Sequence, residues 1–113
     1  MRILNQTKNI LLANSVILAN TPLRRMKGLL GRKEFKQNEA IILQPCNSIH
    51  TFFMRFPIDV IFVDKDNKIV KTISQLVPFR LSGIYFNAVM AIELPVGTIQ
   101  ASGSSESDKI ALE

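Results

Sequence analysis

The stretch from Cys46 to Asp64 constrains the fold more than any other part of the sequence. It contains the only cysteine, the only histidine and four of the seven phenylalanines, among many β-branched side chains. Such side chains fit the half-buried surface of a sheet, and Pro57, which cannot donate to a ladder, separates two runs. We therefore predict two strands, Ser48–Met54 and Ile58–Val63. Because both faces of these strands are mostly apolar, we expect them to be covered on both sides.

Short apolar runs bounded by turn residues continue through the rest of the 113 residues. Further strands are predicted at Met1–Leu4, Ile10–Ala19, Glu39–Gln44, Lys68–Ser74, Ala88–Leu94 and Lys109–Leu112. The sequence contains no repeat and no linker that would divide it, so we expect a single domain over residues 1–113. The pattern predicts a mainly β fold, a compact β-barrel or two-sheet sandwich of about seven to eight short strands with one short helix.

The one predicted helix has a clear start and an unusual first turn. Thr21 and Pro22 are typical of an N-cap and of the first helical position, and Gly31 is the expected end. An apolar stripe at helical spacing is formed by Leu23, Met26 and Leu30. Arg24 and Arg25 occupy the first turn, where the helix dipole disfavours cations. Because such a broken local rule often marks a site, one of these arginines is a candidate functional residue.

Three ionisable residues stand within apolar runs: His50, Asp59 and Glu93. Burial of a polar or charged group without a partner costs free energy, so we expect them to gather with Arg24 or Arg25. Together they would form a polar cleft that orients a sugar or another polyhydroxylated ligand, or that acts as acid and base. The alternative is a buried polar network that only fixes the register of the sheet.

Other classes of function find little support in the sequence. Cys46 and His50 have no further Cys or His to complete a metal site, and about 13 Å of extended strand would separate them, too far for a catalytic dyad. The net charge of +5 comes largely from residues 24–36, where Phe35 is the only aromatic, so nucleic acid is not an expected partner. No apolar run has the length of a membrane span, and no signal-peptide pattern is present. We expect no membrane partner and a cytoplasmic location.

Three motifs together resemble a known family. They are Arg25–Arg32, Ser48–Asp64 and Glu93–Gly97. Through them, residues from about 21 to 112 are similar to a prokaryotic family known as domain of unknown function, family 192. The resemblance implies a small β-rich domain with a short helix and no established biochemical activity. It also implies that Arg25, His50, Asp59 and Glu93 are the recurring polar residues.

The chain departs from the pattern of that family at four positions. Leu30 stands where the family usually has methionine, and Arg24 where an acidic residue is common. Asn67 replaces the usual hairpin glycine. Ser107 replaces a glycine before Asp108, so the last turn is expected to differ. Many relatives resemble exported proteins with a leader segment.

We predict a non-enzymatic ligand-binding or accessory module whose cleft is built from Arg25, His50, Asp59 and Glu93 and accepts a small polyhydroxylated or anionic ligand. One alternative is a small hydrolase or lyase that uses His50 with Asp59 or Glu93. Another is a protein-interaction module that uses the basic helix or an exposed strand edge. Glycine-rich phosphate loops and dinucleotide motifs are absent, so no cofactor is expected, and a monomer is the default state.

Overall fold

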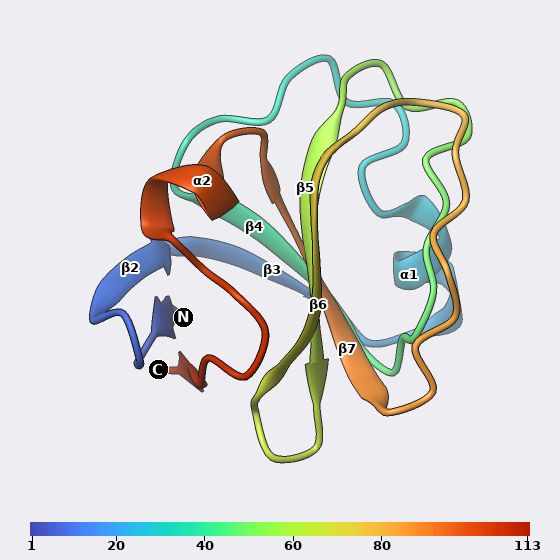
Figure 1. Cartoon of the computed structure of the whole chain (residues 1–113). Coiled ribbons are helices and arrows are strands. Elements are labelled where there is room, and N and C mark those ends of the chain that lie inside the picture. The colour runs from blue at the N-terminus through green and yellow to red at the C-terminus, as the bar shows by residue number, and fades with distance from the viewer.

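The computed structural model describes residues 1–113 and contains eight strands and two short helices (Figure 1). The elements are β1 (Ile3–Asn5), β2 (Ile10–Ala13), β3 (Ser15–Ala19), α1 (Pro22–Lys27), β4 (Glu39–Leu43), β5 (Ile58–Asp64), β6 (Ile69–Leu76), β7 (Ala88–Pro95), α2 (Thr98–Ser102) and β8 (Ile110–Leu112). The larger sheet has the order β3-β4-β7-β5-β6 and the smaller one β2-β1-β8. Only β3 and β4 pair in parallel, because the segment with α1 carries the chain back from the end of one to the start of the other.

The core lies on both faces of the larger sheet. Between the two sheets, Ile3 of β1 and Ile110 of β8 belong to one buried cluster with Ile61 of β5. The opposite face carries a second buried cluster that includes Val60 and Phe62 of β5. Since successive strand residues point to opposite faces, β5 is covered on both sides as expected. The mainly β fold class is confirmed, as a two-sheet sandwich whose sheets do not close into a barrel.

The second face of the larger sheet is covered by α1 and by two long loops, residues 44–57 and 77–87 (Figure 1). Thr51, which is fully buried, joins these loops. Its hydroxyl donates to the Val77 carbonyl (2.7 Å) and accepts from the Arg80 N–H (3.0 Å). Its carbonyl accepts from the Phe79 N–H (3.0 Å). The loops therefore form one fixed layer over the sheet.

The predicted strand Ser48–Met54 is wrong. This segment is a loop whose one ladder contact is an isolated bridge between His50 and Leu81. Phe53 adopts a left-handed backbone conformation (φ 65°), which ends any extended run. The β-branched and aromatic composition here reflects burial against the sheet, not membership of it.

Helix α1 begins as predicted but ends early. The Thr21 hydroxyl accepts from the Arg24 N–H (3.2 Å), which makes Thr21 the N-cap. The helix ends at Gly28, three residues before the expected position. With only six residues, α1 buries none of them, and the expected apolar packing is absent: Leu23 and Met26 are 77% and 68% exposed.

Other element boundaries agree with the sequence more closely. The expected strand Ile10–Ala19 is divided at Asn14 into β2 and β3, and the remaining predicted strands begin and end within two residues of those observed. Helix α2 was not predicted. Neither helix is long and apolar enough to cross a membrane.

Candidate functional site

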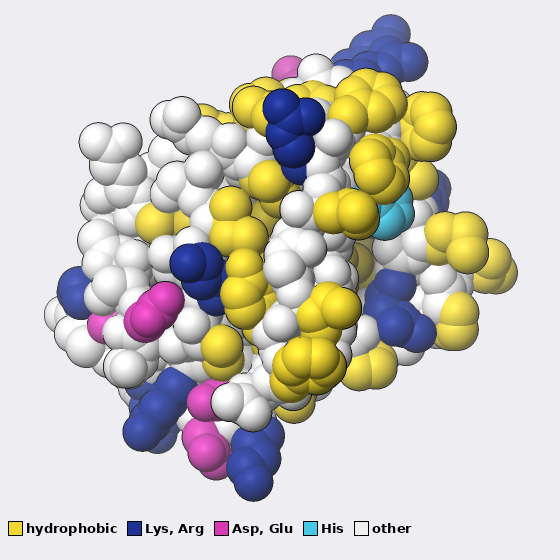
Figure 2. Space-filling view, turned by 45° about the vertical axis from the view of Figure 1, so that its right-hand side comes forward, with side chains coloured by type: hydrophobic (Ala, Val, Ile, Leu, Met, Phe, Trp, Pro, Cys, Tyr) yellow, Lys and Arg dark blue, Asp and Glu magenta, His cyan; other side chains and the backbone are white.

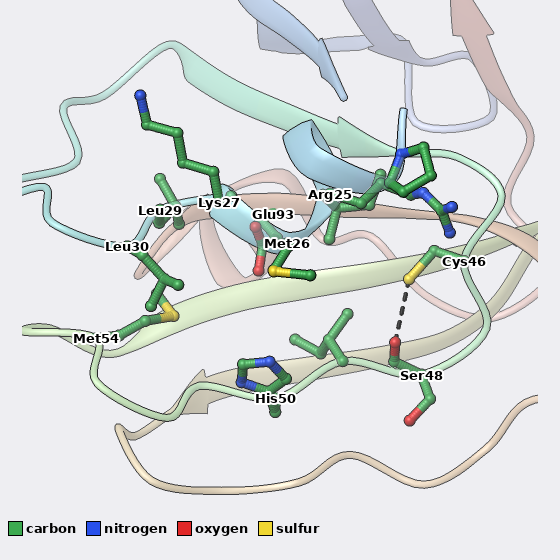
Figure 3. A pocket seen from close by; sticks show the side chains of 14 residues that line it. Arg25, Met26, Lys27, Leu29, Leu30, Cys46, Ser48, His50, Met54 and Glu93 are labelled. Carbon is green, nitrogen blue, oxygen red and sulfur yellow. Dashed lines mark hydrogen bonds between the residues drawn. The ribbon is translucent and has the colours of Figure 1, made fainter. Parts of the chain in front are cut away.

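A cavity of about 310 Å³ lies between α1, the larger sheet and the loop that follows β4 (Figure 3). Its lining residues are Pro22, Arg25, Met26, Lys27, Gly28, Leu29, Leu30, Leu43, Cys46, Ser48, Ile49, His50, Met54 and Glu93. We call it the Glu93 cavity. It contains three of the four residues proposed from the sequence, Arg25, His50 and Glu93, which come from α1, the covering loop and β7.

Glu93 is the most buried polar residue of this cavity. It is 3% exposed, and its Oε1 atom has no hydrogen-bond partner within the protein. The end of α1 approaches it closely, since a Cβ atom at Gly28 would lie 3.6 Å from Oε1. Burial raises the pKa of the Glu93 carboxyl from its usual value of 4.5 to about 7, because the charged form is poorly solvated. Near neutral pH this group therefore holds its proton part of the time.

Arg25 supplies the positive charge of the cavity. Its Nη1 atom donates to the Pro45 carbonyl (3.0 Å), and its Nε atom is buried without an acceptor. Figure 3 shows the guanidinium on the side of the cavity that carries Cys46. Arg25 and Glu93 share the cavity but do not form an ion pair. The protein thus leaves one donor and one acceptor at this cavity without a partner.

His50 is exposed at the mouth of the cavity. Its ring stacks on that of Phe52, with centroids 5.3 Å apart and an interplanar angle of 24°. Its Nδ1 atom accepts from the Phe52 N–H (3.3 Å), so the neutral ring carries its hydrogen on Nε2. His50 forms no hydrogen bond with Glu93.

Cys46 also lines the cavity, but its environment is not that of a nucleophile. The thiol donates to the Ser48 carbonyl (3.1 Å). Burial raises the pKa of Cys46, whereas reactive cysteines need a lowered one. The thiol therefore contributes packing and a weak donor to the wall.

Asp59 is not part of this site. It is fully buried on the opposite face of the sheet, where it accepts hydrogen bonds from the backbone N–H groups of Gln75 (3.0 Å), Gly97 (3.1 Å) and Ile99 (2.9 Å). These bonds hold the start of α2 and the end of strand β6 against β5. The expectation that Asp59 joins the other three is corrected: its carboxylate is fully used in supporting the fold.

Sequence reasoning missed Lys27 and Gly28. Lys27 stands at the exposed edge of the cavity, and Gly28, with φ 44°, lets the helix end close to Glu93. A signal was present, since both lie in the motif Arg25–Arg32. The position of that motif beside β7 could not be known before the strands were paired.

The arrangement suits recognition of a polar molecule. Apolar walls surround a buried carboxyl and a guanidinium, and an imidazole and an ammonium group stand at the exposed edge, a combination that is common in sites for small ligands. No group of three or more His, Cys, Asp or Glu side chains is placed to hold a metal ion.

Comparisons with known proteins extend over almost the whole chain. Residues 3–112 match the family model DUF192, described as "Uncharacterized ACR". The chain is 35% identical to UPF0127 protein TK1120 of Thermococcus kodakarensis, covering 96% of this chain and 71% of that protein. It is 31% identical to UPF0127 protein PH1112 of Pyrococcus horikoshii, covering 96% of each.

A solved structure has the same fold. The crystal structure of a protein of unknown function from Novosphingobium aromaticivorans superposes with a TM-score of 0.86, covering 98% of this chain and 84% of that one at 21% sequence identity. The family resemblance read from the three sequence motifs is confirmed: this chain belongs to the uncharacterised family known as domain of unknown function, family 192.

Proposed function

We propose that this protein binds a small hydroxylated anion, such as a sugar acid, in the Glu93 cavity. The observation that carries the proposal is the pair of buried, unpartnered atoms, Glu93 Oε1 and Arg25 Nε, in the wall of one cavity. Buried polar atoms are almost always hydrogen-bonded. Two exceptions in one cavity point to a partner that is not part of the chain.

The charges of the cavity select the class of ligand. Arg25 and Lys27 carry positive charge at neutral pH, and Glu93 is the one carboxyl of the lining. A ligand carboxylate or phosphate would be held by Arg25, while a ligand hydroxyl would donate to the Glu93 carboxyl. His50 Nε2 is a further donor at the mouth. The volume of about 310 Å³ fits a molecule of the size of a single sugar.

A titration followed by NMR tests the proposal. Gluconate and galacturonate are the anionic probes, glucose the neutral one and acetate the anion without hydroxyl groups. We expect the sugar acids to shift the backbone amides of Gly28, Ile49 and His50, and to leave those of α2 unchanged. If none of the four probes shifts these amides at millimolar concentration, the proposal fails.

Two variants refine the test. Arg25→Met removes the guanidinium but keeps most of the apolar stem, and we expect it to weaken sugar-acid binding about tenfold or more, since a hydrogen bond to a charged group is worth about 1.5–3 kcal/mol. Binding of glucose should change little. Arg55→Met, an exposed arginine outside the cavity lining, is the matched control and should bind like the unmodified protein.

A second candidate is a small hydrolase or lyase that uses His50 with Glu93. The pKa of about 7 for Glu93 favours it, because a general acid works best when its pKa lies near the operating pH. The version with Asp59 is not proposed, since that carboxylate lies on the other face of the sheet. A panel of ester and glycoside substrates would test the candidate, and equal turnover by Glu93→Gln would exclude it.

Other expectations from the sequence concern location, assembly and partners. A cytoplasmic location, a monomeric state, the lack of a nucleic-acid partner and the use of α1 or a strand edge as a protein-interaction surface all stay predictions.

A further inference from the structure

Exposed aromatic and aliphatic side chains gather on the two loops that cover the larger sheet. We call this surface the aromatic patch and define it as the exposed Phe53, Phe79 and Leu81 together with the half-buried Phe52. Phe53, Phe79 and Leu81 are 75%, 55% and 69% exposed. The rings of Phe53 and Phe79 meet edge to face with centroids 5.7 Å apart, and Phe52 lies 6.4 Å from Phe79. Figure 2 shows hydrophobic side chains around the histidine, which stacks on Phe52.

The backbone at this patch is strained in a way that presents the rings to solvent. Phe53 and Phe79 have φ values of 65° and 62°, a left-handed conformation that is a genuine outlier for a bulky residue. Glycine or asparagine would adopt it more easily. Thr51 holds both loops in place through its buried hydroxyl and backbone. An exposed phenylalanine buries little of its ring in the fold, and a left-handed backbone favours other residues. We therefore take the presentation of the ring to solvent as the reason for phenylalanine at these positions.

The charge around the patch is mostly positive. The three segments that cover this face of the sheet, residues 20–38, 44–57 and 77–87, hold eight of the fourteen Lys and Arg residues and one acidic residue, Glu34. The rest of the chain, with six basic and eight acidic residues, has a formal charge of −2 although the whole carries +5. Of the eight cations, only Arg32 and Lys36 are in ion pairs. The positive charge is therefore concentrated on the face that also exposes the rings.

We propose that the aromatic patch docks on the surface of a bilayer that contains anionic phospholipids. Apolar side chains at loop tips enter the boundary between headgroups and acyl chains, and the surrounding cations attract the anionic headgroups. The unpaired cations are spread over three segments, which fits a diffuse negative surface better than a few carboxylates of a protein. This proposal departs from the sequence analysis, which predicted no membrane partner because no segment can span a membrane. Docking on a bilayer surface needs no spanning segment.

Sedimentation with lipid vesicles tests this docking. Vesicles of phosphatidylcholine mixed with phosphatidylglycerol should pellet the protein, vesicles of phosphatidylcholine alone should pellet much less, and salt should weaken the binding. The double variant Phe53→Asn with Phe79→Asn removes both rings and relaxes the backbone, so that it folds. We expect it to lose at least about tenfold in affinity. Leu11→Asn, at an exposed leucine of β2 on the smaller sheet, is the control and should bind normally.

Tryptophan fluorescence gives an independent readout, since the chain contains no tryptophan. In Phe53→Trp the indole should emit at shorter wavelength when anionic vesicles are added, and in Leu11→Trp it should not. Failure of the protein to pellet with anionic vesicles overturns the proposal, whatever protein partner is later found. Pelleting without a shift in Phe53→Trp, or with full affinity in the double asparagine variant, would mean attraction by charge alone and would also overturn it.

Discussion

Replacing Glu93 by glutamine should make the protein more stable at neutral and basic pH. Glu93 is almost fully buried, its Oε1 atom has no partner, and no ion pair compensates its charge. The folded state must therefore either keep the proton on this carboxyl or bury an unpaired charge. Glutamine has nearly the same shape and cannot ionise. A gain in stability on removing a buried charge would mark Glu93 as kept for a purpose other than folding.

The size and sign of the effect follow from the pKa. Burial raises the pKa of Glu93 from 4.5 to about 7, so the folded protein binds this proton more tightly than the unfolded chain does. The free energy of unfolding therefore falls as the pH rises between about 4.5 and 7, and levels off above that. At about 1.4 kcal/mol for each tenfold change in proton affinity, the full loss is about 3 kcal/mol, and most of it falls between pH 5 and pH 8.

Urea denaturation of the protein and of Glu93→Gln at several pH values between about 5 and 8 measures this loss. Each variant is compared with itself across the pH range, which cancels any fixed cost of burying the amide. Two other acidic residues change stability only at lower pH, because their pKa values are lowered in the folded protein. A hydrogen bond from the Lys36 N–H lowers the pKa of Glu39. Burial raises the pKa of Asp108, but hydrogen bonds from Asn5, Ser105 and Lys8 outweigh it and lower the pKa. Starting near pH 5 leaves them outside the measured window.

Glu106→Gln, at an exposed glutamate, is the control and should show the same pH profile as the unmodified protein. We expect the profile of Glu93→Gln to be flatter by about 2–3 kcal/mol over the range. Parallel profiles for the protein and Glu93→Gln would refute the reasoning, since they would mean that the carboxyl finds solvent or a partner in the folded state.

Three further substitutions have expected outcomes. Asp59→Ala leaves three backbone donors, one buried and two partly buried, without an acceptor and should cost roughly 3–5 kcal/mol in urea denaturation, with Asp59→Asn at about half of that; a loss below about 1 kcal/mol would contradict the assigned role. Thr51→Val removes the bonds to Val77 and Arg80 and should cost about 1–3 kcal/mol in thermal unfolding, with faster amide exchange in residues 77–82; unchanged exchange would argue against a single loop layer. Phe53→Asn alone should raise the free energy of unfolding by about 0.5–1 kcal/mol by relieving the left-handed backbone, and a loss would show that the ring packs in the fold.

Local composition was enough to find most strands. β4, β5 and β7 are short apolar runs between turn residues, and the N-cap of α1 followed from Thr21 and Pro22. The prediction of a strand at Ser48–Met54 was wrong because a buried loop and a buried strand can share the same composition. What distinguishes them is the position of the partner loop 77–87, which contacts Thr51 through hydrogen bonds, and that position is a property of the whole fold.

Helix α2 had no local signal. It has five residues, too few for a periodic pattern, and its N-cap Gly97 has no side chain with which to cap it. The acceptor comes instead from Asp59, thirty-eight residues earlier in the chain, which bonds to the N–H groups of Gly97 and Ile99. A helix stabilised by so distant a carboxylate cannot be read from its own sequence.

The candidate site was predicted in part for a related reason. The alternation of side chains along β5 predicted that Asp59 shares one face of the sheet with Ile61 and Val63, and the structure places it on that face. The pairing of β5 with β7 sets Val60 opposite Glu93 and Asp59 opposite Leu94, so that the two carboxylates face opposite sides. That register depends on a pairing across more than thirty residues. Sequence reasoning could name both residues as unusual but could not separate their roles.

The larger sheet therefore acts as a partition between two tasks. Asp59 and the α2 turn brace one side, while Glu93 and the α1 segment shape a recess on the other. Substitutions around the recess should therefore leave the hydrogen bonds of the brace in place. The same division makes the chain a convenient starting point for redesign, with specificity altered on one side and robustness kept on the other.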